Sequence, residues 1–141
     1  MSSISIATLP RMTRDALSTL LLSTSSPNKL AIIDVRDSDH IGGHIHSSTW
    51  VPSSKLELHL PELVRTLQDK EKVVFHCALS QQRGPSAALR YARERERVLG
   101  PEKSKTQEVY VLEGGFVRWQ EKYGKDTRLT EAYVEDIWRE Y

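Results

Sequence analysis

The chain has 141 residues, of which 28% are charged and 38% hydrophobic, and its formal net charge at pH 7 is +1. With a net charge so close to zero, no overall electrostatic field favours the binding of nucleic acid. No apolar run approaches the roughly 20 residues of a membrane span. The N-terminal stretch lacks the basic and apolar segments of a secretory signal, and a single cysteine excludes an internal disulfide. We therefore expect a cytoplasmic and/or nuclear protein with no membrane partner, and nucleic acid binding is not favoured.

Apolar patterns along the chain predict an alternation of strands and helices. In chain order they predict a weak strand at 4–6, a helix at 14–22, a strand at 30–35, a weak strand at 49–51, a helix at 60–67, a strand at 73–75, a helix at 85–99, a strand at 109–112, and helices at 116–123 and 130–141. Polar clusters at 23–28 and 100–105 are typical of loops.

The three main strand candidates are continuous apolar runs rich in β-branched residues. Such runs are typical of strands covered on both faces, as in a parallel sheet. Thr13 is a suitable cap for the first predicted helix, and Pro61 suits the first turn of the second. The alternation therefore favours an α/β fold, in which ligands bind beyond the carboxyl ends of the strands.

The only cysteine, Cys77, follows the strand at 73–75, and Arg83 lies six positions later, directly before Gly84-Pro85 and a helix. Five intervening residues are about enough to curl backbone N–H groups around a tetrahedral anion. The helix N-terminus adds a positive end, and an arginine binds two oxygens at once. The same donors stabilise a thiolate, so the pattern favours a nucleophilic Cys77.

A lone cysteine after an apolar strand is, by itself, more often a small buried hydrophobe than a catalyst. The C-x5-R spacing at a strand-to-helix junction favours a functional Cys77 over that alternative. These residues alone leave two functions open, a sulfur carrier and a nucleophile that attacks an oxyanion.

Three segments resemble signatures of the rhodanese superfamily. The segment HCALSQQRGP at 76–85 resembles the active-site loop of the cell-division-cycle dual-specificity phosphatases and of the related fungal and plant arsenate reductases. The motif D-V-R at 34–36 with G-H-I at 43–45 resembles the first signature of the superfamily. The motif E-G-G-F at 113–116 resembles its last.

The resemblance covers roughly residues 32 to 119 in the expected order. It implies a single rhodanese-like phosphatase domain over residues 1–141. The expected fold is α/β and rhodanese-like, a five-stranded parallel sheet with helices on both faces. In this superfamily D-V-R fixes loops through ion pairs, so a structural role is expected for Asp34 and Arg36.

By the same resemblance, Cys77 is the nucleophile that forms a phosphocysteine, and Arg83 binds the phosphoryl oxygens. The chain is then a protein tyrosine or dual-specificity phosphatase. His76 holds the position that tunes the thiolate, and the hydroxyl of Ser80 is a candidate donor to it. The phosphate-binding loop comprises the backbone amides of Ala78, Leu79, Ser80, Gln81, Gln82 and Arg83.

The loop interior ALSQQ departs from the cell-cycle enzymes, which generally place acidic residues there. The proton donor to the leaving oxygen is therefore unassigned, with Asp37, Asp39 and Glu113 on neighbouring loops as candidates. Those enzymes also carry a second cysteine and a long regulatory N-terminal region. This chain begins almost at the domain, so we expect no such control. We expect no metal and no cofactor, and an external thiol such as glutathione is needed only if arsenate is reduced.

The main alternative is a glutathione- and glutaredoxin-coupled arsenate reductase that uses the same loop, since arsenate mimics phosphate. Sulfurtransferases of the superfamily typically have a loop one residue shorter, which disfavours sulfur transfer. A non-catalytic binding module is disfavoured because both Cys77 and Arg83 are present. The expected partners are a phosphorylated protein or a small phosphoester, and oxyanions such as phosphate or arsenate.

Overall fold

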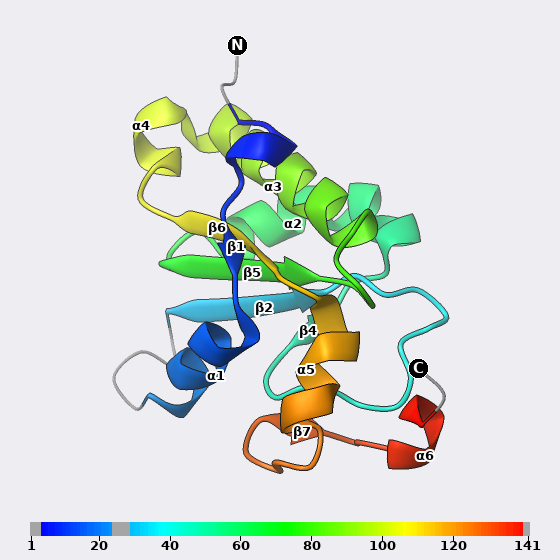
Figure 1. The fold of residues 1–141 in the computed structure, drawn as a ribbon. Helices are drawn as coiled ribbons and strands as arrows, with labels where there is room; N and C mark the ends of the chain where they lie inside the picture. The colour runs from blue at the N-terminus through cyan, green and yellow to red at the C-terminus, as the bar shows by residue number, and fades with distance from the viewer. Residues whose placement is uncertain (1–3, 24–28, 140–141) are drawn as a thin grey trace.

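A five-stranded parallel sheet forms the centre of the computed structural model, which describes residues 4–23 and 29–139 (Figure 1). Every pair of neighbouring strands in it is parallel. In spatial order the strands are β1 (Arg11–Met12), β6 (Glu108–Leu112), β5 (Lys72–His76), β2 (Leu30–Asp34) and β4 (Thr49–Trp50). The predicted five-stranded parallel sheet is thus confirmed, and β5 lies at its centre.

Helices cover both faces of the sheet, as predicted. On one face lie α2 (Leu56–Thr66) and α3 (Arg83–Leu99), and on the other α1 (Arg14–Leu22) and α5 (Gly115–Tyr123) (Figure 1). The central strand β5 contributes side chains to the cores on both faces of the sheet, because successive side chains of a strand point to opposite faces. Val73 and Phe75 join the core beneath α2 and α3, while Val74 joins the opposite core.

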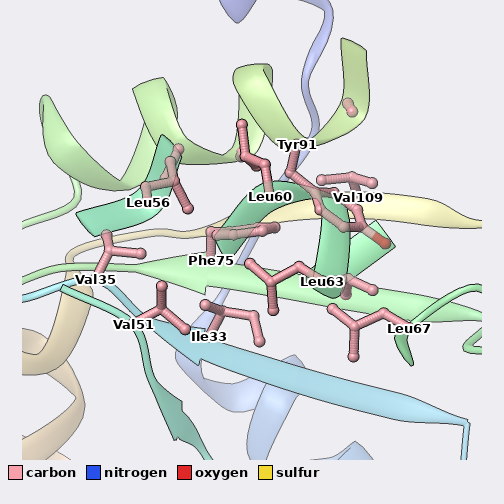
Figure 2. Close-up of a cluster of buried hydrophobic side chains, with 14 of the residues drawn as sticks. Ile33, Val35, Val51, Leu56, Leu60, Leu63, Leu67, Phe75, Tyr91 and Val109 are labelled. Carbon is pink, nitrogen blue, oxygen red and sulfur yellow. The ribbon is translucent and has the colours of Figure 1, made fainter. Parts of the chain in front are cut away.

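The core between the sheet and the pair α2 and α3 is built from branched aliphatic and aromatic side chains (Figure 2). Leu56, Leu60 and Leu63 of α2 and Tyr91 of α3 meet Phe75 of the sheet there. Full burial of one such side chain stabilises the fold by roughly 1.5–3 kcal/mol. A second core around Trp119 and Phe116 fixes α5 against the other face.

Shorter elements complete the chain. They are the 3-10 helices η1 (Ile6–Thr8) and η2 (Ser53–Lys55), the antiparallel strands β3 (His44–Ile45) and β7 (Thr130–Glu131), and the helices α4 (Pro101–Ser104) and α6 (Glu135–Trp138). No helix in the described part of the chain has the length and apolar composition needed to span a bilayer.

Two N-terminal predictions differ from the structure. The weak strand at 4–6 is wrong, because Ser5 and Thr8 form a reciprocal capping box that begins η1 instead. The second helix begins at Leu56 rather than at 60, so Pro61 lies inside it. Pro61 has no N–H to donate to the preceding turn, so the helix lacks one backbone hydrogen bond there. Pro61 lies on the exposed side, and the burial of Leu60, Leu63 and Val64 on the other side outweighs this loss.

Two C-terminal predictions are only partly correct. The helix predicted at 130–141 is present at 135–138 as α6, whereas 130–131 form β7. There the Thr130 hydroxyl accepts from Trp119 Nε1 (2.9 Å) and donates to the Tyr123 carbonyl (2.7 Å). The loop predicted at 100–105 contains α4. Residues 24–28 of the other predicted loop, and residues 140–141, lie outside the described part.

Candidate active site

The loop from Cys77 to Gln82 lies at the carboxyl end of β5 and leads directly into α3 (Figure 1). The chain bends at each residue from Ala78 to Gln82. The strand-to-helix junction predicted from the C-x5-R spacing is therefore present. It lies where the neighbouring strands β2 and β6 also end, so the loops that follow them surround it.

Two carbonyls of the loop point away from its centre and bind the first turn of α5. The Cys77 carbonyl accepts from the Phe116 N–H (3.0 Å), and the Ala78 carbonyl accepts from the Val117 N–H (2.9 Å). Gly115, with φ +60°, allows this close approach, because a Cβ there would lie 2.6 Å from the Cys77 carbonyl oxygen. The E-G-G-F motif thus anchors the loop that carries Cys77.

Cys77 is buried, with 3% of its surface exposed, and its Sγ accepts a hydrogen bond from the Ser80 N–H at 3.2 Å. Ser80 adopts a left-handed backbone conformation (φ 57°) that turns this N–H toward the sulfur. The Ser80 hydroxyl, which the sequence offered as a donor to the thiolate, instead accepts from the Cys77 N–H (3.4 Å). That part of the prediction is corrected, because the donor to the sulfur is the backbone and not the side chain.

His76 is fully buried behind the loop. Its Nδ1 is 3.0 Å from the Cys77 carbonyl oxygen, which can only accept, so Nδ1 carries the proton. Its Nε2 has no hydrogen-bond partner among residues 4–23 and 29–139 and lies 3.7 Å from Asp34 Oδ2. Burial lowers the pKa of His76, and the nearby Asp34 only partly opposes this effect.

Asp34 and Arg36 form a buried ion pair, with Arg36 Nη2 2.7 Å from Asp34 Oδ2. Arg36 Nη2 also donates to the Gly43 carbonyl (2.8 Å), and its guanidinium lies 4.3 Å from the Phe116 ring centre. Burial opposes ionisation of Asp34, but the hydrogen bonds and the charge of Arg36 help to hold the pKa of the carboxyl below its usual value. The pair therefore fixes the loop after β2, as expected for the D-V-R motif.

Arg83, the first residue of α3, pairs with two carboxylates of the loop after β2. Its Nη1 and Nη2 donate to the two oxygens of Asp39 at 2.8 and 2.6 Å, and Nη1 also donates to Asp37 Oδ2 at 3.2 Å. These bonds raise the pKa of Arg83 and lower the pKa of Asp39 to about 2. The guanidinium that was expected to meet an oxyanion thus holds carboxylates in this structure.

The third acid candidate, Glu113, lies beside a different arginine. Arg11 Nη1 donates to Glu113 Oε2 (3.0 Å) and to the Ser80 carbonyl (3.1 Å). Sequence reasoning missed Arg11, since no local pattern links it to a residue 69 positions away. Only the pairing of β1 with β6, in which Met12 aligns with Leu112, brings it to the loop.

A hollow of about 280 Å³ opens beside the loop on the α2 and α3 side. Its lining residues are Ser53, Leu56, Gln82, Arg83, Ser86, Ala87 and Arg90. Leu79 and Gln81, in the loop interior, are exposed. Within residues 4–23 and 29–139, no group of three His, Cys, Asp or Glu side chains is placed to hold a metal ion.

The fold and this loop define an α/β domain with a cysteine at the carboxyl end of the central strand. Residues 17–122 match the rhodanese-like domain family, and the chain belongs to that family. The CDC25-like phosphatase YCH1 of Saccharomyces cerevisiae is 39% identical over 127 residues, which cover 83% of this chain and 83% of that protein. Arsenate reductase 2.1 of Oryza sativa subsp. japonica is 42% identical over 118 residues, with 80% and 69% covered.

Two solved structures extend this comparison to the fold. A yeast protein tyrosine phosphatase of the rhodanese family superposes with a TM-score of 0.80 and 35% identity, covering 97% of this chain and 100% of that one. An As–Sb reductase from Leishmania major superposes with a TM-score of 0.72 and 35% identity, with 84% and 81% covered. Phosphatases and arsenate or As–Sb reductases therefore both occur among proteins that are at least 35% identical to this chain over the aligned residues.

Proposed function

We propose that the chain is a cysteine-dependent protein tyrosine or dual-specificity phosphatase. The observation that carries this proposal is the position of Cys77, the first residue of the loop that leads into α3. The Ser80 N–H donates to its Sγ at 3.2 Å. A donor in this position stabilises a thiolate, and the N-terminus of a 17-residue helix favours an anion at the same place. The relatives named as phosphatases support the same conclusion.

The reaction has two steps. In the first, the Cys77 thiolate attacks the phosphorus of a phosphomonoester, the S–P bond forms, the P–O bond to the leaving group breaks, and a proton passes to the leaving oxygen. In the second, water attacks the phosphocysteine and inorganic phosphate leaves, which restores the thiol. The amides of residues 78 to 83 and the guanidinium of Arg83 are the groups we assign to the phosphoryl oxygens.

Replacement of Cys77 by serine tests this mechanism. With an aryl phosphate as substrate, Cys77→Ser should lower kcat by at least about a thousandfold, because the hydroxyl has no activating base at hand. Arg83→Lys should also lower kcat/KM, since an ammonium cannot hold two oxygens in one plane. Near-normal turnover by a folded Cys77→Ser protein would contradict the mechanism.

A second candidate function, arsenate reduction on the same loop, is favoured by the relatives named as arsenate reductases and by the absence of a carboxylate between Cys77 and Arg83. Cys77 and one external thiol would together give two electrons to arsenate, forming one mixed disulfide, arsenite and water. Cys77 is the chain's one cysteine, so glutathione and glutaredoxin would have to supply the second thiol and reduce the disulfide. Glutaredoxin-coupled arsenate turnover, compared with aryl phosphate turnover in the same preparation, decides between the two.

A further inference from the structure

The ion pair between Arg83 and Asp39 has the geometry of an arginine that binds an oxyanion. Two guanidinium nitrogens donate to the two carboxylate oxygens at 2.8 and 2.6 Å. This parallel arrangement is the one in which arginine also binds two oxygens of a phosphate. Asp39 therefore occupies the donors that the proposed function assigns to the substrate.

Asp39 is held in place by its own loop. Its Oδ1 accepts from the Asp37 N–H at 2.9 Å, and its side chain is 39% exposed. Asp37 is less available to Arg83, because its oxygens also accept from the Ser53 hydroxyl (2.6 Å) and the Ser54 N–H (3.0 Å). Asp39 is thus the principal partner of the guanidinium.

The carboxylates around Arg83 oppose the binding of an anion while the Arg83–Asp39 ion pair is intact. Two carboxylates, Asp37 and Asp39, face one guanidinium, so a dianionic phosphoryl group that entered beside the intact cluster would be repelled. The repulsion is relieved if Arg83 leaves Asp39 and donates to the substrate instead. The side chain of Arg83 is 33% exposed, so it is not enclosed by the core.

We propose that Asp39 is a positioning residue that holds Arg83 in the free protein and exchanges it for the substrate oxyanion. This inference rests on the proposed function and specifies how that site is regulated. Every binding event must break the Arg83–Asp39 pair, so the affinity for oxyanions is lower than the loop alone would give. The exchange also returns Arg83 to Asp39 when phosphate leaves.

The test measures binding of inorganic phosphate by calorimetry at fixed ionic strength, in a Cys77→Ser protein that cannot turn over. Asp39→Asn is the informative variant, because the amide keeps an oxygen to accept from the Asp37 N–H while the negative charge is lost. We expect phosphate to bind about fivefold more tightly to this variant, a change typical of a partly exposed ion pair. In the protein with Cys77 intact, Asp39→Asn should lower KM for an aryl phosphate more than it changes kcat. Asp39 is ionised near neutral pH, because Arg83 lowers its pKa to about 2, so its replacement removes no proton donor.

Two controls separate exchange from a general charge effect. Glu113→Gln removes one negative charge beside the same loop, but Glu113 pairs with Arg11, so phosphate affinity should change by less than about twofold. In an Arg83→Ala background, Asp39→Asn should have little effect, because the competing pair no longer exists.

The outcomes distinguish the two proposals. Phosphate binding that is unchanged or weaker in Asp39→Asn, or an equal gain in Glu113→Gln, overturns the exchange and leaves the proposed function standing. Persistence of the Asp39 effect without Arg83 also overturns it. Absence of phosphate binding in every variant, Asp39→Asn included, overturns the proposed function and the exchange together.

Discussion

His76 connects the loop that carries Cys77 to the buried charges behind it. Its Nδ1–H donates to the Cys77 carbonyl, and its Nε2 faces Asp34, which Arg36 already neutralises. A neutral His76 therefore meets the hydrogen-bonding need of the carbonyl without adding a second cation to the pair. Burial is the main reason that the pKa of His76 is lowered.

This lowered pKa predicts a loss of stability in mild acid. Below the usual histidine pKa of 6.5 the unfolded chain binds a proton that the folded chain does not, so the free energy of unfolding falls as pH decreases toward the folded pKa. His76→Asn, whose amide can still donate to the Cys77 carbonyl, should lose less stability between about pH 7.5 and about pH 5.5. Urea denaturation at the two pH values measures this difference.

His40 is the comparison for this experiment, since burial also lowers its pKa and it lies 3.5 Å from the same Asp34 oxygen. His40→Asn should remove another part of the pH dependence, and the two parts should not add strictly, because both histidines lie beside the same Asp34 oxygen. An unchanged pH dependence in His76→Asn would contradict the assignment of a neutral His76.

At the scale of elements, the first turn of α5 and the Cys77 loop form one unit. The helix begins at Gly115, where the positive φ and the adjacent carbonyls of Cys77 and Ala78 leave no room for a side chain. The N–H groups at the start of α5, which have no partner inside the helix, bind these carbonyls. The shape of the loop therefore depends on a helix that follows it by more than 30 positions.

Gly115→Ala should therefore damage both stability and activity. A left-handed alanine costs roughly 1–2 kcal/mol, and displacement of the packed carbonyls adds a further 1–3 kcal/mol or so. Gly100→Ala is a control for the backbone cost alone, because Gly100 also has a positive φ (+87°, with ψ 161°) but no neighbouring atom within 4 Å of an added Cβ. It should lose only the backbone contribution and keep full aryl phosphate turnover. Full aryl phosphate turnover by folded Gly115→Ala, with the folded fraction measured by thermal or urea unfolding, would refute the contact.

The elements that the sequence predicted best are those with strong hydrophobic patterns. The strands at 30–35, 73–75 and 109–112 and the helix at 85–99 are each present within two residues of the expected bounds. The two-residue strands β1, β3 and β7 were not predicted, since two residues carry no period. They form where Met12, Ile45 and Leu129 pack into the second core, which only the tertiary structure shows.

In the candidate site too, the features encoded locally in the sequence were predicted, and those that depend on tertiary contacts were not. Cys77, its loop and Arg83 follow one another in the chain, so their spacing places them at one strand end. The partner of Arg83 was not predictable, because Asp39 belongs to a loop 44 positions away and was considered only as an acid. Ser80 illustrates a finer limit, since the residue was identified but only the φ of 57° shows that its N–H, and not its hydroxyl, meets the sulfur.

At the scale of the whole molecule, the two ends of the sheet differ in role: the carboxyl ends of the strands carry the candidate site, and contacts at the amino ends stabilise the fold. Cys77 and Arg83 lie at the carboxyl end, whereas Arg95, which is 1% exposed, lies at the amino end of β5 and β6. Its guanidinium donates to the carbonyls of Gln68, Lys103 and Ser104 at 3.2–3.3 Å. One side chain thus joins α3 to the segments before both strands.

Loss of this guanidinium should lower stability and leave the site intact. Arg95→Met keeps an apolar stem of similar length but removes a charged donor from three carbonyls. The Lys103 carbonyl still accepts from Thr106 and the Ser104 carbonyl from the Gln107 N–H, so the free energy of unfolding should fall by about 1–3 kcal/mol. Arg97→Met is the matched control on the same helix, because Arg97 is 71% exposed and its ion pair is with Glu94 of that helix. It should change stability by less than about 0.5 kcal/mol.

The decisive measurement pairs unfolding with kinetics well below the transition temperature. Folded Arg95→Met should retain kcat/KM for an aryl phosphate within about twofold, because its contacts lie at the end of the sheet away from Cys77. A fall in kcat/KM larger than the unfolded fraction explains would show that α3 transmits changes from Arg95 to its first residue, Arg83. The two ends of the molecule would then act as one unit, and the separation of stability from function argued from the contacts would be wrong.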